Sequence, residues 1–389
     1  MVTNVTIDRI QTSRDRAATG QDAIATAADR RAVAEDKIAT AASAAEATNQ
    51  AGIATAQANS ATTQAGVATT KAAEAAVSAA DALAAPATVF LKRVLSIAVL
   101  RTIAPTTDFN PLLTSYYGDG NGGSGEFRGV TGAAPGTYVD NGGTIIVPTG
   151  GDGSAVWTRL DDGKGVSVRA FGAKGDATSD DTTAIRNAIS ACKTINIPSG
   201  SYKVTGHIPI PGMRRIFGDG YDSLIFRSSD DTATETITDS DSTVYSGRNT
   251  LLFIESGGLG TYISDIRLAG NDNATTGTTL IEFGNNVRNV IFHGVRGASG
   301  KIGMLSSGEV WLSKFDHVWL AACENGINFT NSGFKTTCAF EHCYLENCGT
   351  GYEFTNMQYC TLYACGADHI SRPLINPYDA TDVSGYAKA

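Results

Sequence analysis

One short apolar template recurs through the C-terminal half of this chain. Its form is apolar-x-x-apolar-x-apolar, and its copies start 22 to 28 residues apart: Ile263-Ile266-Leu268, Val287-Val290-Phe292, Phe315-Val318-Leu320, Phe340-Cys343-Leu345 and the start Leu362-Cys365. Glycine and asparagine turns separate the copies. Short strands repeated at this interval predict a β-solenoid, because each coil buries its apolar side chains only against its neighbours. The irregular spacing leaves a β-sandwich as the alternative.

The segment from residue 166 to 206 precedes the repeats and predicts a strand, a turn, a helix and further strands. Alternating apolar residues mark the first strand and two glycines the turn: Val166, Val168, Ala170, Gly172 and Gly175. Ser179 is expected to cap the helix, with Asp180 and Asp181 in its first turn, near the positive end of the helix dipole. The helix has one apolar face, made of Ala184, Ile185, Ala188, Ile189 and Cys192. It is well placed to close an open sheet.

This segment resembles the start of the pectate-lyase-like right-handed parallel β-helix found in phage tailspikes and secreted polysaccharide lyases. The resemblance rests on a set of residues that act as a fold signature: Phe171, Gly172, Ala173, Gly175, Asp176, Asp180, Asp181, Thr182, Ile185, Ile189, Ile197, Pro198, Gly200 and Tyr202. It implies that the helix caps the first rung and hides a sheet edge. A metal cluster of Asp176, Asp180 and Asp181 is the alternative, but it lacks the alternating spacing of a calcium loop.

Alanine dominates from residue 17 to 85, without proline or aromatic residues, and this composition cannot build a globular core. Residues seven apart form a thin seam that continues after a one-residue slip: Ile10, Ala17, Ile24, Arg31, Ile38, Ala45, then Ile53, Ser60 and Val67. The spacing predicts a coiled coil. Gly20, Gly52 and Gly66 each lower helix propensity by about 1 kcal/mol and could segment the rod. The alternative is a flexible or lone helical linker.

Residues 86–162 predict a small β-rich neck. Ser96 is expected to cap a short helix that bears Ile97, Leu100 and Ile103. A glycine-rich stretch at 116–129 predicts a wide turn, and strands are expected at 144–148 and 155–160. The glycine loop lacks the lysine and serine of a nucleotide-binding loop. This layout also resembles phage tailspikes.

The expected architecture is therefore mainly β, a parallel β-helix preceded by an alanine-rich stalk and a neck. The expected parts are a coiled-coil virion-attachment stalk at 1–85, the neck at 86–162 and the pectate-lyase-like β-helix at 163–389. The repeats end near Ile370, and the last residues offer no closing helix. Either the protein continues past Ala389 or it is an unusually short spike, and catalytic residues could lie beyond this sequence.

The charge pattern restricts the partners. The net charge is −9 and no basic cluster occurs, which argues against nucleic acid and against an anionic membrane surface. A neutral or weakly charged ligand fits better. No apolar run has the length of a signal peptide core or a membrane span. The chain is expected to be made in the host cytoplasm and released by cell lysis, and no cofactor is expected.

Seven cysteines are present, and five of them fall between Cys338 and Cys365. They are expected to be reduced and packed in ladders one coil apart: Cys323 near Cys348, Cys338 near Cys360, and Cys343 over Cys365. A zinc site at Cys338, His342 and Cys343 is disfavoured, because neighbouring side chains of a strand point to opposite faces. No metal is expected.

Glycan cleavage needs two carboxylates about 5–10 Å apart, or a base and a cation in a lyase. The repeats place Asp316 beside Glu341, with Glu346 further along, and these are the candidate catalytic residues. His317 falls beside His342. The alternative is that these are surface charges at turns and a hydrogen-bonded histidine ladder. The same region is rich in aromatic residues suited to stacking on sugar rings, and Trp319, Tyr344 and Tyr363 are the candidate substrate-binding residues.

The resemblance to tailspikes implies a homotrimer in the virion tail. It implies that the N-terminal part docks on other phage tail or baseplate proteins, and that the β-helix recognises and depolymerises a bacterial surface polysaccharide, as a hydrolase or a lyase. A non-enzymatic structural or receptor-binding fibre with the same fold is the alternative. A secreted polysaccharide lyase is the third hypothesis.

Overall fold

The computed structural model describes residues 2–84, 93–228, 231, 233–271 and 276–371. The chain divides into two compact units, residues 1–81 and 82–389. The predicted boundary at residues 85 and 86 lies outside the described residues, as do residues 372–389. No helix in the described part of the chain combines the length and the apolar character that a bilayer crossing requires.

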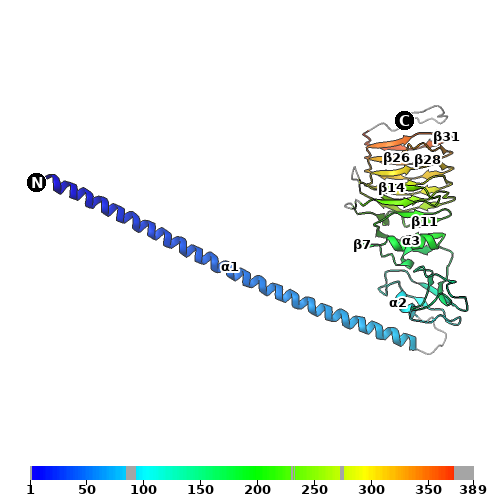
Figure 1. Cartoon of the computed structure of the whole chain (residues 1–389), viewed down its shortest axis with the longest axis horizontal. Coiled ribbons are helices and arrows are strands. Elements are labelled where there is room, and N and C mark those ends of the chain that lie inside the picture. The colour runs from blue at the N-terminus through cyan, green and yellow to red at the C-terminus, as the bar shows by residue number, and fades with distance from the viewer. Residues whose placement is uncertain (1, 85–92, 229–230, 232, 272–275, 372–389) are drawn as a thin grey trace. The chain divides into compact units, whose positions relative to one another are not determined.

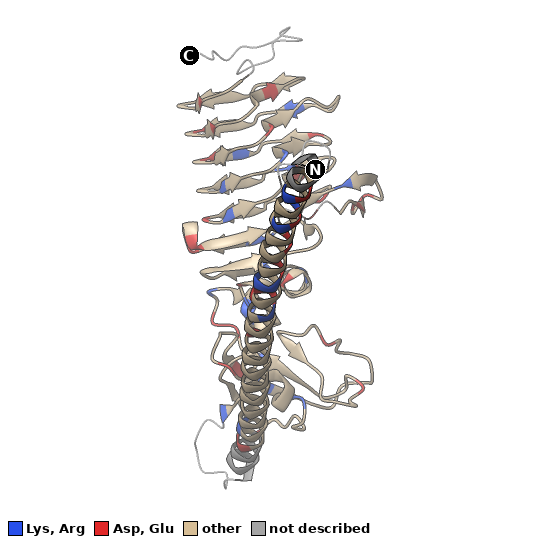
Figure 2. Cartoon of the chain, turned by 90° about the vertical axis from the view of Figure 1, so that its left-hand side faces the viewer, with Lys and Arg blue, Asp and Glu red and all other residues tan. Residues whose placement is uncertain are grey.

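The first unit is one long helix, α1 (Val2–Ala84), and it confirms the predicted helix (Figure 1). The helix does not break at Gly20, Gly52 or Gly66. Every side chain from residue 7 to 75 is exposed, and most of the acidic and basic residues lie in the N-terminal half of the helix, with none between Glu46 and Lys71 (Figure 2). Several threonine hydroxyls donate to the carbonyl four residues earlier, as Thr12 does to Asp8 at 2.7 Å. The association of α1 into a coiled coil stays a prediction.

The neck begins with β1 (Arg93–Val94) and α2 (Ile97–Leu100), and Ser96 caps α2 as predicted, by accepting from the Val99 N–H at 3.3 Å. Its sheet has the order β1-β2-β3-β5-β4, with the further strands β2 (Leu112–Leu113), β3 (Gly125–Val130), β4 (Ile145–Ile146) and β5 (Val156–Arg159). Strands β4 and β5 confirm the two predicted strands. The core of the neck is made of Val94, Ile97, Leu100, Leu113, Phe127, Ile146 and Trp157.

The prediction of one wide turn at 116–129 is wrong in its second half, because β3 begins at Gly125. Gly129 lies in this strand, and a Cβ there would come within 2.2 Å of the Thr106 carbonyl oxygen. This glycine therefore reflects a close approach of two backbone segments and not a turn.

The solenoid opens with β6 (Val166–Ser167), the 3-10 helix η1 (Val168–Phe171), β7 (Asp176–Asp180) and α3 (Thr182–Ala191). The expected strand from 166 to 170 is therefore wrong after Ser167. The Ser167 hydroxyl accepts from the Arg169 N–H at 3.2 Å, and Gly172, at φ 95°, ends the 3-10 helix in the left-handed region. The apolar face predicted for α3 is confirmed, since Ile185, Ala188 and Ile189 are buried.

The aspartates of the fold signature bind backbone N–H groups. Asp181, and not Ser179, is the N-cap residue of α3, and its carboxylate accepts from Lys174 and Gly175 at 2.7 and 3.0 Å. Asp180 accepts from the first helical N–H, that of Thr182, at 3.0 Å. Ser179 instead lies in β7. The Ser179 cap is therefore wrong, because the helix begins three residues after it.

Two more signature residues join the turn to the strands. The Tyr202 hydroxyl donates to the Pro198 carbonyl at 2.9 Å. The Asp176 carboxylate accepts from the backbone N–H groups at 178 and 179, which lowers its pKa below the ordinary value. These bonds give the signature a structural role.

The second unit continues as a parallel β-solenoid, as predicted, with coils stacked along one axis (Figure 1). We name its sheets 1 to 4. Sheet 1 contains β6, β8 (Thr194–Ile197), β11 (Arg215–Gly218), β16 (Tyr262–Ser264), β20 (Ile291–His293), β24 (Lys314–Asp316), β28 (Ala339–Glu341) and β32 (Thr361–Tyr363). Sheet 2 contains β7, β9 (Gly200–Lys203), β12 (Ser223–Phe226), β17 (Arg267–Ala269), β21 (Arg296–Ala298), β25 (Trp319–Ala321), β29 (Tyr344–Glu346) and β33 (Gly366–Asp368).

The other strands complete the coils. Sheet 3 contains β10 (Ile208–Ile210), β15 (Thr250–Ile254), β18 (Thr279–Phe283), β22 (Ile302–Ser306), β26 (Asn325–Phe329) and β30 (Thr350–Phe354). Sheet 4 contains β19 (Val287–Arg288), β23 (Val310–Trp311), β27 (Lys335–Thr336) and β31 (Met357–Gln358). A 3-10 turn, η2 (Gly220–Asp222), precedes β12, and an antiparallel hairpin, β13 (Glu235–Thr238) and β14 (Val244–Arg248), lies between β12 and β15.

The predicted copy of the repeat that starts at Val287 is wrong by five residues. Phe292, and not Val287, aligns with Ile263 and Phe315 in sheet 1. The true copy therefore has Gly297 at its third apolar position. A Cβ there would lie within 2.8 Å of the side chains of Leu280 and Leu320, which fill the space. The template failed at this coil because neighbouring leucines supply the missing apolar volume.

Stacked phenylalanines and cysteines fill the interior. The Phe315 ring stacks on Phe340 at 4.7 Å and on Phe292 at 5.8 Å. All seven cysteines are free thiols. The predicted ladders are confirmed: Cys338 and Cys360 are in contact, as are the two pairs Cys343 with Cys365 and Cys323 with Cys348.

Candidate functional site

The coils turn sharply where sheet 1 meets sheet 2, and the corner residue has positive φ in successive coils: Asp265, Gly294, His317, His342 and Ala364. A pocket of about 630 Å³ lies over this corner, and its lining includes His293, His317, His342, Trp319 and Tyr344. A second pocket of about 390 Å³ continues across sheet 2 and shares Tyr221, Arg296 and Trp319 with the first. Together we call these two pockets the corner groove.

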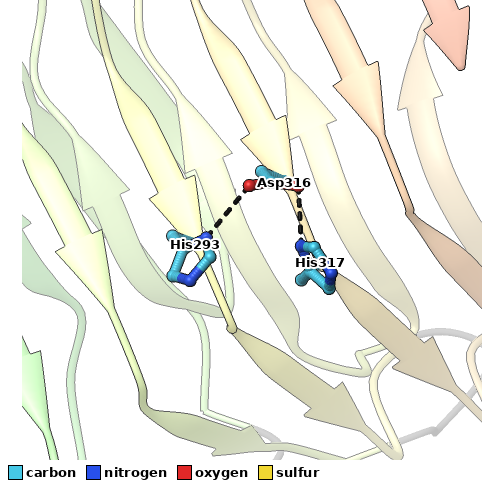
Figure 3. A group of neighbouring side chains, drawn as sticks. All are labelled: His293, Asp316 and His317. Carbon is cyan, nitrogen blue, oxygen red and sulfur yellow. Dashed lines mark hydrogen bonds and ion pairs between the residues drawn. The ribbon is translucent and has the colours of Figure 1, made fainter.

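Asp316 lies at the centre of a group of three imidazoles beside the groove, and Figure 3 shows two of them, His293 and His317. The Nδ1 atom of His317 is 2.7 Å from its carboxylate, that of His293 is 3.1 Å away, and that of His342 is 3.3 Å away. The rings come from neighbouring coils, because Asp316 pairs in register with His293 on one side and Glu341 on the other. His317 also stacks on His342 at 4.7 Å, and both rings hydrogen-bond to Asp316, so they form a stacked pair in place of the expected hydrogen-bonded ladder.

These contacts keep the Asp316 carboxylate ionised. Its partial burial by itself would raise its pKa, but the hydrogen bonds from His342, His293 and His317 outweigh burial and lower the pKa to about 2. Since only 17% of its side chain is exposed, the carboxylate is shielded by its partners. Asp316 therefore suits the role of a base or nucleophile and not that of an acid.

Glu341 lies next to Asp316, as predicted, and a carboxylate oxygen of each lies within 4.8 Å of the other. Its carboxylate also forms an ion pair with Lys314 at 2.7 Å. Glu346 is not part of this group. It lies at the far end of β29, in register with Ala321 and Asp368 on sheet 2, and it lines neither pocket.

The predicted aromatic residues fall in two places. Trp319 and Tyr344 are neighbours in register on sheet 2, line the larger pocket, and have their rings 6.1 Å apart. Each is a little more than one third exposed, so a flat face is available to a ligand. Tyr363 instead follows Glu341 in sheet 1, edge-on to His342 at 5.7 Å.

Sequence reasoning missed four residues of the groove. Arg267 and Arg296 are register partners on sheet 2, and both guanidinium groups contact the Tyr221 ring. His293 was missed because of the register error at Phe292. A sequence signal for His293 exists: each stacked phenylalanine is followed by a polar residue of this group. The three pairs are Phe292-His293, Phe315-Asp316 and Phe340-Glu341. Tyr221 lies on η2 and belongs to no repeat, so the template could not find it.

The same polar group has the donor atoms that a cation would need. One atom each from His293, Asp316 and His317 lie within 4.8 Å of one another, and so do one each from Asp316, Glu341 and His342. Imidazole and carboxylate donors suit zinc. In this structure the Nδ1 atoms of all three imidazoles bind Asp316. The absence of a metal at this group stays a prediction from the sequence.

Two family models match the chain. Residues 93–162 match a model described as the phage tail protein small four-stranded beta-sheet domain. Residues 165–366, more than half of the chain, match a model described as rhamnogalacturonase A/epimerase, pectate lyase-like. The resemblance recognised in the sequence is thereby confirmed.

Solved structures share the fold. The enzymatically active domain of tailspike protein 2 of bacteriophage CBA120 is 16% identical, with a TM-score of 0.56 over 71% of this chain and 40% of that chain. The gp42 tailspike of Acinetobacter phage vb_AbaP_AS12 is 18% identical, with a TM-score of 0.58 over 72% of this chain and 49% of that chain. At these identities the likeness concerns the fold.

A sequence relative is the pre-neck appendage protein of Bacillus phage B103, which is 39% identical over 61 residues. The match covers 16% of this chain and 7% of that protein. The chain therefore spans less than half the length of each of these three relatives.

Proposed function

This chain belongs to the rhamnogalacturonase A/epimerase, pectate-lyase-like family, and from this premise we propose that it is a phage tailspike that binds and depolymerises a bacterial surface polysaccharide. The phage tail domain at 93–162 and the tailspike folds of the matched structures support this assignment. The observation that carries it is the corner groove, where an ionised carboxylate with three imidazoles lies beside exposed aromatic rings.

The parts of the chain have separate tasks in this proposal. Residues 1–85 form a trimeric stalk that attaches to other tail or baseplate proteins, residues 86–162 form the neck, and residues 163–389 form the glycan-binding β-helix. The similarity to a phage pre-neck appendage protein supports a place in the virion tail. The isoleucines seven residues apart on α1, such as Ile24 and Ile38, are exposed in a single chain. Association of several helices would bury them, which supports a trimeric stalk.

Sugar binding is assigned to the aromatic side chains. Trp319 and Tyr344 line the larger pocket side by side, and Tyr363 extends the aromatic surface past Glu341. Flat rings of this kind bind the apolar faces of sugars and bury area at a low cost in side-chain entropy. The three residues span neighbouring coils, as a polymer lying along the solenoid requires.

Proton transfer is assigned to the Asp316 group. Asp316 and Glu341 have the close spacing of retaining glycosidases, where the carboxyl groups are about 5–5.5 Å apart. Lys314 pairs with Glu341, however, and such a pair favours the charged carboxylate over the proton donor that hydrolysis needs. We therefore assign Asp316 as the base or nucleophile and His317 as the proton-transfer group. Asp316 holds the His317 Nδ1 atom at 2.7 Å, which leaves Nε2 for the substrate.

The test compares Asp316→Asn and His317→Gln with wild type on capsule from a susceptible host. We expect each to lower the release of reducing ends about a hundredfold or more, with unchanged circular dichroism. Glu346→Gln is the matched control and should keep full activity, because Glu346 lies outside the groove. Full activity in both groove variants would reject this catalytic group. A wild-type protein that binds capsule but releases no fragments would identify a receptor-binding fibre.

A further inference from the structure

The Asp316 carboxylate is the meeting point of imidazoles from three successive coils. The Nδ1 atoms of His317 and His342 lie 2.7 and 3.3 Å from one of its oxygens. The Nδ1 atom of His293 lies 3.1 Å from the other oxygen (Figure 3). Two ligand atoms on one tetrahedral zinc ion are about 3.3 Å apart, because each lies about 2.0–2.1 Å from the metal. The spacing of these nitrogen and oxygen atoms therefore matches that of ligands around a single metal ion.

The backbone at the corner lets residues adjacent in sequence share a ligand. In a strand, consecutive side chains point to opposite faces, which is the argument against zinc at Cys338, His342 and Cys343. His317 instead follows the end of β24, at φ 53°, and His342 follows the end of β28, at φ 52°. The left-handed conformation breaks the alternation, so the His317 ring reaches the carboxylate of the preceding residue. The alternation gives no argument against a metal at this corner.

The carboxylates of the group leave one negative charge for a cation. Asp316 and Glu341 are neighbours in register, and Lys314 pairs with Glu341 at 2.7 Å, which neutralises one of the two. The imidazoles add ligands without adding negative charge. A neutral imidazole that donates from Nδ1 offers that nitrogen to a metal once its proton moves to Nε2. A metal ion at this point therefore replaces the hydrogen bonds to Asp316.

The donor set selects one class of ion. We propose that His293, Asp316 and His317, with His342 beside them, form a binding site for a divalent transition metal ion of the zinc class. Imidazole nitrogen suits such ions, whereas calcium and magnesium take oxygen ligands. The proposal is opposite to the sequence-based expectation of no metal, because that expectation concerned the cysteine region and the aspartates of the fold signature.

Two overlapping sets of three ligands compete for the ion. In the part of the chain that the structure describes, donor atoms within 4.8 Å of one another occur in His293-Asp316-His317 and in Asp316-Glu341-His342. The first set, which we call the Asp316 triad, is favoured. The pair between Glu341 and Lys314 has to break before Glu341 binds a metal, and the Asp316 triad has no such cost.

Metal binding and the proposed proton transfer exclude each other. The ion takes the Asp316 carboxylate and the His317 Nδ1 atom, so the base is occupied. The proton of His317 then lies on Nε2, which cannot accept another from the substrate. Zinc should therefore inhibit depolymerisation reversibly. This consequence rests on the proposed function, whereas metal binding does not.

The test titrates zinc chloride into the full, reduced chain by isothermal titration calorimetry. We expect one zinc ion per chain, and calcium and magnesium chloride should bind at least about tenfold more weakly. His293→Gln and His317→Gln should each weaken zinc binding at least about tenfold, because each removes one ligand. Circular dichroism of both variants should match that of wild type.

His369→Gln is the matched control. His369 pairs with a single carboxylate, that of Asp368, at 3.1 Å, and neither residue belongs to a set of three ligands. This variant should bind zinc as wild type does. Absence of zinc binding by wild type would overturn the proposal, as would wild-type affinity in both triad variants, since the ion would then lie elsewhere. A preference for calcium would overturn the assignment of imidazole ligands.

A second readout separates this proposal from the catalytic one. Zinc should stop the release of reducing ends from capsule over the concentration range in which it binds, and a chelator should restore the release. Zinc bound at the Asp316 triad while cleavage continues would keep the metal site and reject the catalytic roles of Asp316 and His317. Zinc binding by a chain that never cleaves capsule would do the same.

Discussion

The helix α1 and the solenoid differ in the exposure of their apolar side chains: those of α1 are exposed and those of the solenoid are buried. In α1, Ile24 and Ile38 are 72% and 71% exposed, whereas Phe292, Phe315 and Phe340 in the solenoid are fully buried. The solenoid closes its own core because each coil covers the next. A lone helix has no second surface on which to bury its seam, so its stability depends on propensity and on association. Variants in the two units should therefore fail by different routes.

The largest effect should come from the core of the solenoid. Phe315→Ala removes a ring packed between two others, and we expect a loss of about 3–5 kcal/mol in the free energy of unfolding. Urea unfolding followed by circular dichroism measures it. Tyr359→Ala is the control, and it should change stability little because Tyr359 is 77% exposed. A loss below about 1 kcal/mol at Phe315 would contradict the continuous core.

The next effect concerns association through α1. Replacement of Ile24, Ile38 and Ile53 by serine should convert a trimer into single chains, because burial of each isoleucine is worth about 1.5–3 kcal/mol. Sedimentation of the full chain at micromolar concentration gives the mass. The control replaces Thr26, Thr40 and Thr55 by serine, two residues on from each isoleucine and off the seam, and should leave the mass unchanged. A wild-type protein that sediments as one chain would disprove the coiled coil.

A smaller effect is expected on the pH dependence of stability, to which the Asp316 carboxylate contributes. The folded pKa of Asp316, about 2, lies below its ordinary value of 3.8. Its contribution to stability is therefore complete above pH 3.8 and is lost as the pH falls towards 2. The urea midpoints of wild type and Asp316→Asn should differ most above pH 4 and converge near pH 2. Asp368→Asn, in an exposed pair with His369, is the control. Parallel pH profiles of wild type and Asp316→Asn would refute the shift.

The smallest effect is expected at the thiols, all of which lie in the second unit. Denatured protein, without reductant, should react with seven equivalents of a thiol reagent. Folded protein should react more slowly, because the thiols of Cys323, Cys338, Cys343 and Cys348 are buried and the reagent cannot reach them. Five reactive thiols or fewer would mean that at least one ladder is oxidised.

Much of the fold was predictable because its signals are local. The alanine-rich helix, the Ser96 cap, the apolar face of α3 and the recurring template each depend on residues close in sequence. The ladders of cysteines and the pairing of Asp316 with Glu341 followed from coils of similar length. The coil from Ile263 to Phe292 is longer than the coils that follow it, so equal spacing did not predict its register. The apolar template also fails there, because Leu280 and Leu320 fill the volume beside Gly297 that an apolar side chain would otherwise occupy.

The sequence by itself therefore predicted the helix, the solenoid, and Asp316, Glu341, His317 and His342 of the polar group, because a recurring template of short strands lets each coil bury its apolar side chains against the next. Only the tertiary structure decided that His293 joins Asp316 and that Arg267 and Arg296 share Tyr221. Those contacts depend on register between coils and on a turn outside the repeat. A one-residue change in coil length moves an outward side chain to another position, and local patterns do not record that shift.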